Sequence, residues 1–217
     1  MGADSAGSDT REEIMHATYL ALCEHGYANL SMQDIADELD KSRSLLHYHY
    51  DTREELLLAF IDHLVGWIGD ELEETDTEDP RARLIEYVDR FAIEPGEQRR
   101  ERFATALFEL RLQAVHNERF REKLAEHYCG NVEAAAEIIA DGIEDGVFHP
   151  VDPERTGEII YTALEGARMN QVLLDAEGAS IRMRDAILEY VVRSLIDVTA
   201  VMKATDVNVD VDGAGGT

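Results

Sequence analysis

The sequence predicts an all-α protein, and three kinds of observation lead to this class. Apolar residues recur at helical spacing in most segments of the chain, beginning with Ile14, Ala17 and Ala21 on one face. Ser31 and Thr52 each stand three residues before a carboxylate, which is the pattern of a capped helix N-terminus. Glycine and proline residues separate the periodic segments. We therefore expect about nine helices, arranged as a small N-terminal bundle and a larger C-terminal helical domain.

The composition is strongly acidic. The 217 residues include 46 Asp and Glu against 20 Lys and Arg, which gives a formal net charge of -26, and lysine occurs only at Lys41, Lys123 and Lys203. A surface of this kind stays hydrated and soluble in concentrated salt. We therefore expect a protein adapted to a cytoplasm with molar salt, as in a halophilic archaeon. An acidic protein from an organism of ordinary salinity is the alternative.

Several classes of protein find no support in the sequence. No apolar run is long enough to cross a membrane, and the first ten residues lack the basic and apolar regions of a secretion signal. We therefore expect a cytoplasmic protein without a membrane partner. Cys23 and Cys129 lie far apart inside helical patterns, so we expect reduced core thiols. The spacing of His116, His127 and Cys129 fits no standard metal site, and we expect neither a metal nor another cofactor.

One segment reverses the acidic character of the chain. The stretch from Ser31 to Arg53 is expected to form two short helices joined by a tight turn, with a further helix starting at its end. Within it, residues 41–50 contain no acidic side chain and carry both basic and aromatic residues. The first helix, over residues 11–25, is expected to end at Gly26 and to complete a small three-helix bundle. This is the arrangement of a helix-turn-helix unit.

The region from Ile14 to Leu58 resembles the DNA-binding domain of TetR-type transcriptional regulators. The resemblance rests on Gly26-Tyr27, the LSMQDIADEL segment, the stretch from Ser42 to Tyr50 and the sequence REELL at 53–57. Taken in order and at this spacing, these short matches form a strong signal. The remaining chain is similar to the helical ligand-binding and dimerisation domain of the family, and residues 103–175 are similar to its BetI-like branch.

The resemblance places the second helix of the unit in the major groove of double-stranded DNA. Arg43 would make a bidentate contact to guanine, and Leu45 would contact a thymine methyl group. Ser31 and Arg53 would bind phosphates on either side, although Arg53 could instead be a surface charge paired with nearby acids. The expected DNA-binding residues are Ser31, Ser42, Arg43, Ser44, Leu45, His47, Tyr48, His49 and Arg53.

The chain departs from the family pattern in the turn of the unit. Asp40 stands where a glycine is usual, and Lys41 stands where an apolar residue is usual. Aspartate tolerates a left-handed backbone better than most residues, so we expect the turn to survive. The base preference of the family, however, does not carry over. For His47 and His49, phosphate contacts and structural hydrogen bonds are both open, whereas metal binding at this spacing on a helix is geometrically poor.

The expected domain boundaries follow from the acidic and proline-containing breaks. Residues 10–55 would form the DNA-binding domain and residues 56–203 the effector-binding and dimerisation domain, with disordered tails at 1–9 and 204–217. A long helix from Thr52 would link the two domains and end before Pro80. Further helices are expected over 81–93, 98–115, 117–146, 153–175 and 180–203.

The last two expected helices carry more apolar surface than one side of a monomer needs. The resemblance implies a homodimer through residues 153–203, with two recognition helices spaced for a two-fold symmetric operator. The alternative is that these helices only complete the monomer core. A ligand cavity would lie between residues 81 and 175. Its candidate residues mix aromatic walls with polar groups: Tyr87, Phe91, Phe103, Leu107, Arg111, Tyr128, Tyr161 and Arg168.

The expected function is therefore a one-component transcriptional regulator, most often a repressor in this family, that is released from DNA by an unknown small-molecule effector. A constitutive DNA-binding regulator without an effector would have the same N-terminal third. An all-helical enzyme is the other alternative, although the sequence contains no recognisable nucleophile-base pair, phosphate loop or metal spacing. Met1 to Glu55 contains four basic and twelve acidic residues, a net charge of -8, so we expect DNA binding in concentrated salt rather than by long-range attraction.

Overall fold

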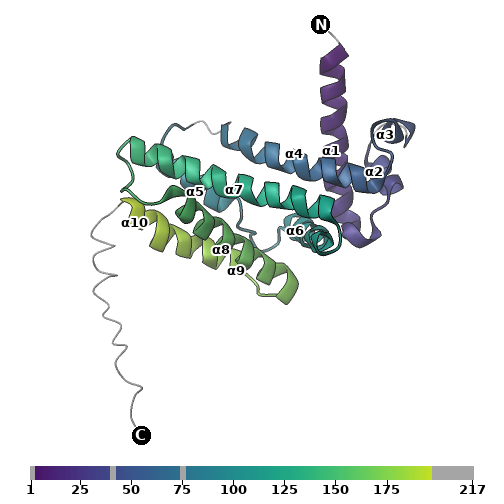
Figure 1. The fold of residues 1–217 in the computed structure, drawn as a ribbon. Helices are drawn as coiled ribbons and strands as arrows, with labels where there is room; N and C mark the ends of the chain where they lie inside the picture. Colours follow the sequence, from purple (N-terminus) through teal and green to yellow (C-terminus); the bar gives the residue numbers. More distant parts are fainter. Residues whose placement is uncertain (1–2, 40–42, 74–76, 197–217) are drawn as a thin grey trace.

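The computed structural model describes residues 3–39, 43–73 and 77–196, with side chains described for 10–39, 44–64 and 77–196. Every regular element in these ranges is helical (Figure 1). Since α9, a π-helical segment and α10 are continuous, the described chain forms nine helices and one short 3₁₀ turn, which confirms the expected fold class. The elements are α1 (Ala3–Asn29), α2 (Met32–Glu38), α3 (Arg43–His49), α4 (Arg53–Glu73), α5 (Pro80–Asp89), α6 (Gln98–Leu112), the 3₁₀ turn (Gln113–Val115), α7 (Glu118–Glu144), α8 (Pro153–Leu174), α9 (Ala179–Ala186), the π segment (Ile187–Val192) and α10 (Arg193–Ile196).

The helices of the N-terminal bundle begin and end largely where the sequence indicates. The regular part of α1 breaks at Gly26, whose φ of 69° favours glycine. The expected capping box at Ser31 is present, because its hydroxyl accepts from the backbone N–H of Asp34 and the Asp34 carboxylate accepts from the Ser31 N–H. One expectation is wrong: α1 begins at Ala3 rather than near Thr10. The segment before Thr10 contains no proline, which would have ended the helix there. The expected tail at 204–217 lies outside the described residues.

The first hydrophobic core joins the N-terminal bundle to the larger domain. It contains residues of α1 to α4 together with Ala106, Leu107 and Leu110 of α6 and Phe120 of α7. The first core therefore continues across the expected boundary between residues 55 and 56. Any displacement of α6 has to be accommodated by side chains that also support the N-terminal bundle.

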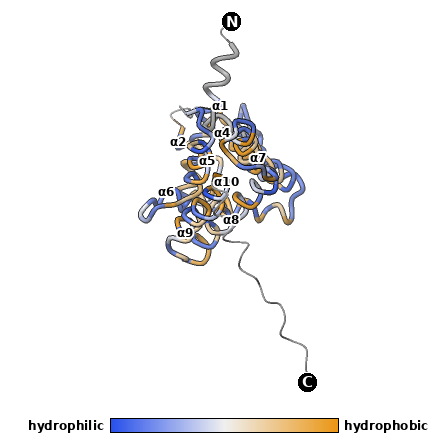
Figure 2. The backbone as a smooth tube through the Cα atoms, turned by 90° about the vertical axis from the view of Figure 1, so that its left-hand side faces the viewer, coloured by the Kyte–Doolittle hydropathy of each residue, from blue (hydrophilic) through white to orange (hydrophobic). Residues whose placement is uncertain are grey.

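The second core lies between α5, α7, α8 and the C-terminal helix, toward the other end of the molecule (Figure 1). Its largest fully buried residues are Tyr87 and Tyr161. Figure 2 shows the hydrophobic stretches of the backbone gathered in the interior of the helical stack. At Gly157 of α8, an added Cβ would lie 2.8 Å from the carbonyl oxygen of Val132 in α7, so this position allows α7 and α8 to approach closely.

The later helices carry the expected breaks. Pro80 is the first residue of α5 and Asp79 caps it, while Asp152 and Pro153 play the same parts at α8. The one clear difference is α5, which ends at Asp89 rather than near residue 93. No helix within the described ranges is long and apolar enough to cross a membrane.

Candidate nucleic-acid interface and ligand cavity

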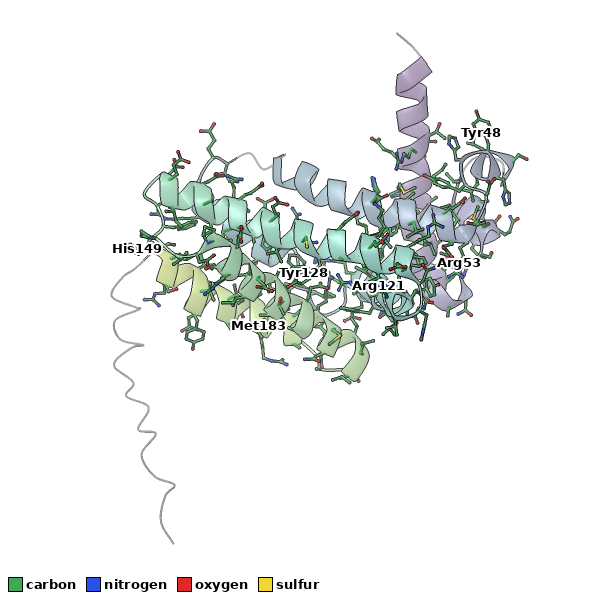
Figure 3. All side chains as sticks on the ribbon, viewed as in Figure 1. Tyr48, Arg53, Arg121, Tyr128, His149 and Met183 are labelled. Atoms are coloured by element: carbon green, nitrogen blue, oxygen red, sulfur yellow. The ribbon has the colours of Figure 1, made fainter. Side chains whose placement is uncertain are left out.

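Helix α3 presents one polar face outward at the end of the molecule away from α10 (Figure 1). Ser44, His47, Tyr48 and His49 are exposed, and the Tyr48 side chain is 82% exposed. Tyr48 stands at the outer edge of the N-terminal bundle in Figure 3. The opposite face buries Leu46 in the first core, and Leu45 is half-buried. Helix α3 contains no acidic residue, so this outward face is suited to approach a polyanion.

Two expected DNA contacts fall beyond what the structure describes. Ser42 precedes the described part of α3, and the side chain of Arg43 lies outside the described side chains, although its backbone begins the helix. Their roles stay predictions. Ser31 is exposed, but its N–H donates to the Asp34 carboxylate over 2.7 Å and its hydroxyl accepts from the Asp34 N–H over 3.2 Å. The hydrogen bonds from Ser31 hold the pKa of Asp34 below its ordinary value, so a phosphate at Ser31 would have to approach beside a carboxylate.

Arg53 is held at the junction of α1 and α4. Its guanidinium group donates through Nη2 to the carbonyl oxygen of Tyr27 and lies 4.4 Å from the centre of the Tyr27 ring. The side chain is half-buried, and Figure 3 shows it at the start of α4 beside α1. This fixes the orientation of the guanidinium. A phosphate contact by Arg53, which stays a prediction, would use the N–H groups that Tyr27 does not bind.

A carboxylate from the larger domain reaches the same junction. The backbone N–H of Tyr27 donates to Oε2 of Glu109 in α6 over 2.9 Å. This oxygen also lies 3.4 Å from the position that a Cβ at Gly26 would occupy. This contact could not be predicted from the sequence, because the two residues are 82 positions apart and no local pattern pairs them. It connects α6 directly to the residue that orients Arg53.

A cavity suited to a small molecule lies beside α6, α7 and α8. It has a volume of about 490 Å³, within the range that binds small ligands. Its wall is mainly apolar with a few polar groups, and Glu109 belongs to it. The lining residues are Phe108, Glu109, Arg111, Leu112, Ala114, Leu124, Tyr128, Tyr161, Thr162, Glu165, Gly166, Met169 and Leu173.

Three of the eight candidate ligand-binding residues line this cavity: Arg111, Tyr128 and Tyr161. Tyr128 lies between α7 and α8 in Figure 3. The other five do not line it, because four of them face the hydrophobic cores and Arg168 is held in an ion pair with Glu165. Tyr87 and Phe91 belong to the second core and Leu107 to the first, Phe103 packs against Tyr19 and Phe60, and Arg168 lies beside the cavity wall.

Glu165 is buried at the centre of a charged cluster at the cavity wall, and the two arginines of the cluster are half-buried. It forms ion pairs with Arg111 and Arg168, and Arg111 also donates to the Tyr161 hydroxyl over 3.1 Å. Burial opposes ionisation of Glu165, but the guanidinium groups of Arg168 and Arg111 outweigh it and lower its pKa. Burial raises the pKa of Tyr161 to about 12, so its hydroxyl is neutral. The role of Glu165 could not be predicted from the sequence, since one glutamate among so many gives no local signal.

His127 completes the surroundings of this cluster. Its side chain is 6% exposed, and burial, assisted by the positive charge of Arg111, lowers its pKa to about 4. It is therefore neutral at pH 7.

The expectation of two core thiols is wrong for Cys129, which is exposed on α7, whereas Cys23 is buried. Among the described residues, no group of three or more His, Cys, Asp or Glu side chains could hold a metal ion.

Two family models match this chain and together cover most of the described helices. Residues 14–60 match the model of bacterial regulatory proteins of the tetR family, and residues 80–196 match the model of the BetI-type transcriptional repressor C-terminal domain. The chain belongs to the TetR family of transcriptional regulators. Regulators of this family bind DNA, and the first match spans the helix-turn-helix from α1 to the start of α4. The BetI-like character expected of the C-terminal domain is confirmed.

Solved structures agree with this membership. A TetR regulator from the halophilic archaeon Haloarcula marismortui is 38% identical, with a TM-score of 0.73 over 88% of this chain and 100% of that one. A regulator from Saccharomonospora viridis in complex with choline is 24% identical, with a TM-score of 0.69 over 88% of this chain and 99% of that one, and shows the fold alone. An uncharacterised helix-turn-helix regulator of Bacillus subtilis is 24% identical over 78% of this chain and 83% of its own length.

Proposed function

We propose that this TetR-family protein is a homodimeric repressor that binds a two-fold symmetric operator through α3 and leaves it when a small molecule occupies the cavity. The observation that carries the proposal is the position of Glu109. Its side chain lines the cavity and accepts the N–H of Tyr27, whose carbonyl and ring hold Arg53. A ligand that contacts Glu109 in the cavity would therefore be connected, through this single side chain, to Tyr27 and Arg53 of the DNA-binding unit.

The proposed DNA contacts rest on the exposed face of α3 and its flanks. Ser44 and Leu45 would face the base edges beside Arg43, and His47, Tyr48 and His49 would contact the backbone. Because the whole chain carries a charge of -26, a dimer would be repelled by DNA in dilute buffer. In molar salt the Debye length falls to about 3 Å, and short-range contacts then decide affinity.

The proposed dimer rests on unpaired apolar side chains along α8 and the C-terminal helix. Ile159 and Tyr190 are 59% and 71% exposed, and Leu173 and Ile196 are also exposed. Two copies of these helices would form a four-helix interface. The dimer would then carry one α3 helix in each protomer, and the two α3 helices would enter successive major grooves of the DNA. The interface proposed for residues 153–203 includes 197–203, which lie outside the described residues.

The proposed switch is a population shift between two dimer geometries. Glu109 and Arg111 lie on the same stretch of α6, so a ligand that contacts Arg111 would bias the position of this stretch. Tyr27 and Arg53 would move with this stretch, since Tyr27 is hydrogen-bonded to Glu109 and Arg53 is hydrogen-bonded to Tyr27. Related structures hold choline or stearoyl-CoA, which supports a small-molecule effector over constitutive binding. Membership in a family of transcriptional regulators supports a non-enzymatic role.

The proposal is tested by footprinting on genomic fragments that include the upstream region of the protein's own gene, in concentrated potassium salt. We expect a protected site with two-fold symmetry. A library of small molecules is then added to the complex, and release is followed by fluorescence anisotropy of the labelled site. Absence of a specific complex at any salt concentration would refute the operator, whereas a complex that no compound releases would favour the constitutive regulator.

A further inference from the structure

The charged cluster of Arg111, Glu165 and Arg168, which is largely shielded from solvent, contains more positive than negative charge. Arg111 and Arg168 share a single carboxylate, that of Glu165. Arginine stays protonated in proteins, so these three side chains carry a net charge of +1. Buried charges are normally paired, because an uncompensated one is costly in a medium of low dielectric constant. In addition, Nε of Arg168 is buried and has no hydrogen-bond partner.

Among the described residues, no carboxylate other than that of Glu165 forms an ion pair with these two guanidinium groups. His127 and Tyr161 are neutral at pH 7, since burial lowers the pKa of His127 to about 4 and raises that of Tyr161 to about 12. The carboxylate of Glu109 lines the same cavity, but it is hydrogen-bonded to the N–H of Tyr27 and forms no ion pair with Arg111 or Arg168. Glu158 accepts from the Tyr128 hydroxyl over 3.2 Å and lies on the exposed side of α8.

We infer that the cavity binds an amphipathic carboxylic acid, whose carboxylate pairs with Arg111 and whose apolar body fills the rest of the space. This inference rests on the proposed function for its biological meaning. Glu165 would keep Arg168 as its partner, so that two guanidiniums face two carboxylates. Arg111 offers the planar donor pair that a carboxylate binds. The Tyr161 hydroxyl accepts from Arg111 and can donate its own proton to the same ligand oxygen.

The rest of the cavity wall determines the polarity and size of the ligand's apolar part. Phe108, Leu112 and Leu124 cover one side, while Met169 and Leu173 cover the side formed by α8. These side chains offer no partner for further polar groups, so sugars and polyamines fit poorly. A volume of about 490 Å³ accommodates a medium-length aliphatic chain or a small aromatic body.

A series of probes with the same apolar chain tests the charge directly. Octanoate, octanol and octyltrimethylammonium are titrated into the full-length protein in concentrated potassium chloride, with binding followed by calorimetry. We expect octanoate to bind, octanol to bind more weakly and octyltrimethylammonium to bind weakest. Equal binding of all three, or tighter binding of the cation, would overturn the inference.

Two variants then assign the contact to the cluster. Arg111→Gln is expected to weaken octanoate binding by about thirtyfold or more and to leave octanol binding unchanged, because a buried charge pair is lost. Arg155→Gln is the matched control, since that side chain is 83% exposed, and it should change neither. Glu165→Gln removes the competing carboxylate and should strengthen octanoate binding, an effect that a general loss of structure would not produce.

The outcomes separate this inference from the proposed function. Unchanged octanoate binding in folded Arg111→Gln, or no strengthening in folded Glu165→Gln, would overturn the assignment to the cluster. Circular dichroism establishes that each variant is folded, and the three-probe series on the unaltered protein decides the ligand class if neither variant folds. Octanoate that binds without changing operator affinity would support the ligand class and contradict the switch. Release of the operator by octyltrimethylammonium alone would contradict the ligand class and support the switch.

Discussion

The carboxylate of Glu109 accepts a hydrogen bond from the backbone N–H of Tyr27 over 2.9 Å and joins the cavity-lining helix α6 to the DNA-binding unit. The carbonyl of the same Tyr27 accepts from Arg53, whose guanidinium also lies over the Tyr27 ring. A side chain that lines the cavity is thus linked through one backbone unit to a candidate phosphate contact. The first core, which contains residues of both α1 and α6, strengthens this connection.

Removal of the Glu109 carboxylate is expected to lower the stability of the protein and to weaken the coupling between the ligand cavity and the DNA-binding unit. Glu109→Ala should lower the free energy of unfolding by about 1–2 kcal/mol, because a charge-assisted hydrogen bond of a half-buried group is lost. Urea denaturation measures this loss. Glu137→Ala, at an exposed position of α7, is the control and should stay within about 0.5 kcal/mol of the unaltered protein. Equal effects of the two substitutions would show that the Glu109 contact contributes nothing.

Arg43 and Arg53 are expected to differ in how they affect DNA binding. Arg43→Ala should reduce discrimination between the operator and a scrambled duplex by about 1–3 kcal/mol, because it removes a base contact. Arg53→Ala should weaken binding to both duplexes alike, because it removes a phosphate contact. Anisotropy titrations with both duplexes measure the two affinities. If each substitution changed specific and scrambled binding in the same ratio, the division of roles would be wrong.

His127 is expected to make stability depend on pH below neutrality. Its pKa is about 4 in the folded protein and 6.5 ordinarily, so between these values the unfolded chain binds more protons. Its contribution is complete above pH 6.5 and is lost as the pH falls toward 4, by an amount on the order of 3 kcal/mol. Urea denaturation across this range should show a shallower decline for His127→Gln. A matching change in the control His116→Gln, at an exposed position, would argue against burial as the cause.

Two glycines of α8 provide a matched test of the packing. Gly157→Ala should destabilise the protein by about 1–3 kcal/mol, because its Cβ would lie 2.8 Å from the Val132 carbonyl oxygen. Gly166→Ala meets no atom within 4 Å and should raise stability by up to about 1 kcal/mol, since alanine favours a helix. Thermal denaturation distinguishes the opposite signs. Equal shifts at both positions would contradict the close approach of α7 and α8.

The fold could be predicted from the sequence because its signals are local. The cap at Ser31, the break at Gly26 and the first-turn prolines Pro80 and Pro153 each act within a few residues. The structure starts helices directly after Ser31 and at Pro80 and Pro153, and it interrupts α1 at Gly26. The start of α1 was less predictable, because a short polar segment without proline supports either a helix or a tail.

The cavity wall could be predicted only in part, because it depends on which helix faces meet. Arg111 and Tyr161 were identified by their chemistry, but the same reasoning selected Tyr87 and Phe91, which pack in the second core. Glu165 was missed since its role comes from two arginines, one of which is on another helix. The contact between Tyr27 and Glu109 likewise arises only when α6 packs against α1.

Operator spacing tests the central claim most directly. A duplex that contains the footprinted operator is compared with one that has about five base pairs, half a helical turn, inserted at its centre. Affinity is measured by anisotropy in concentrated potassium salt. If two α3 helices of one dimer read the two halves together, the insertion places one half-site on the opposite side of the duplex, and affinity should fall toward that of a scrambled duplex. Equal affinity for both duplexes would contradict a dimer that holds its recognition helices one helical turn apart.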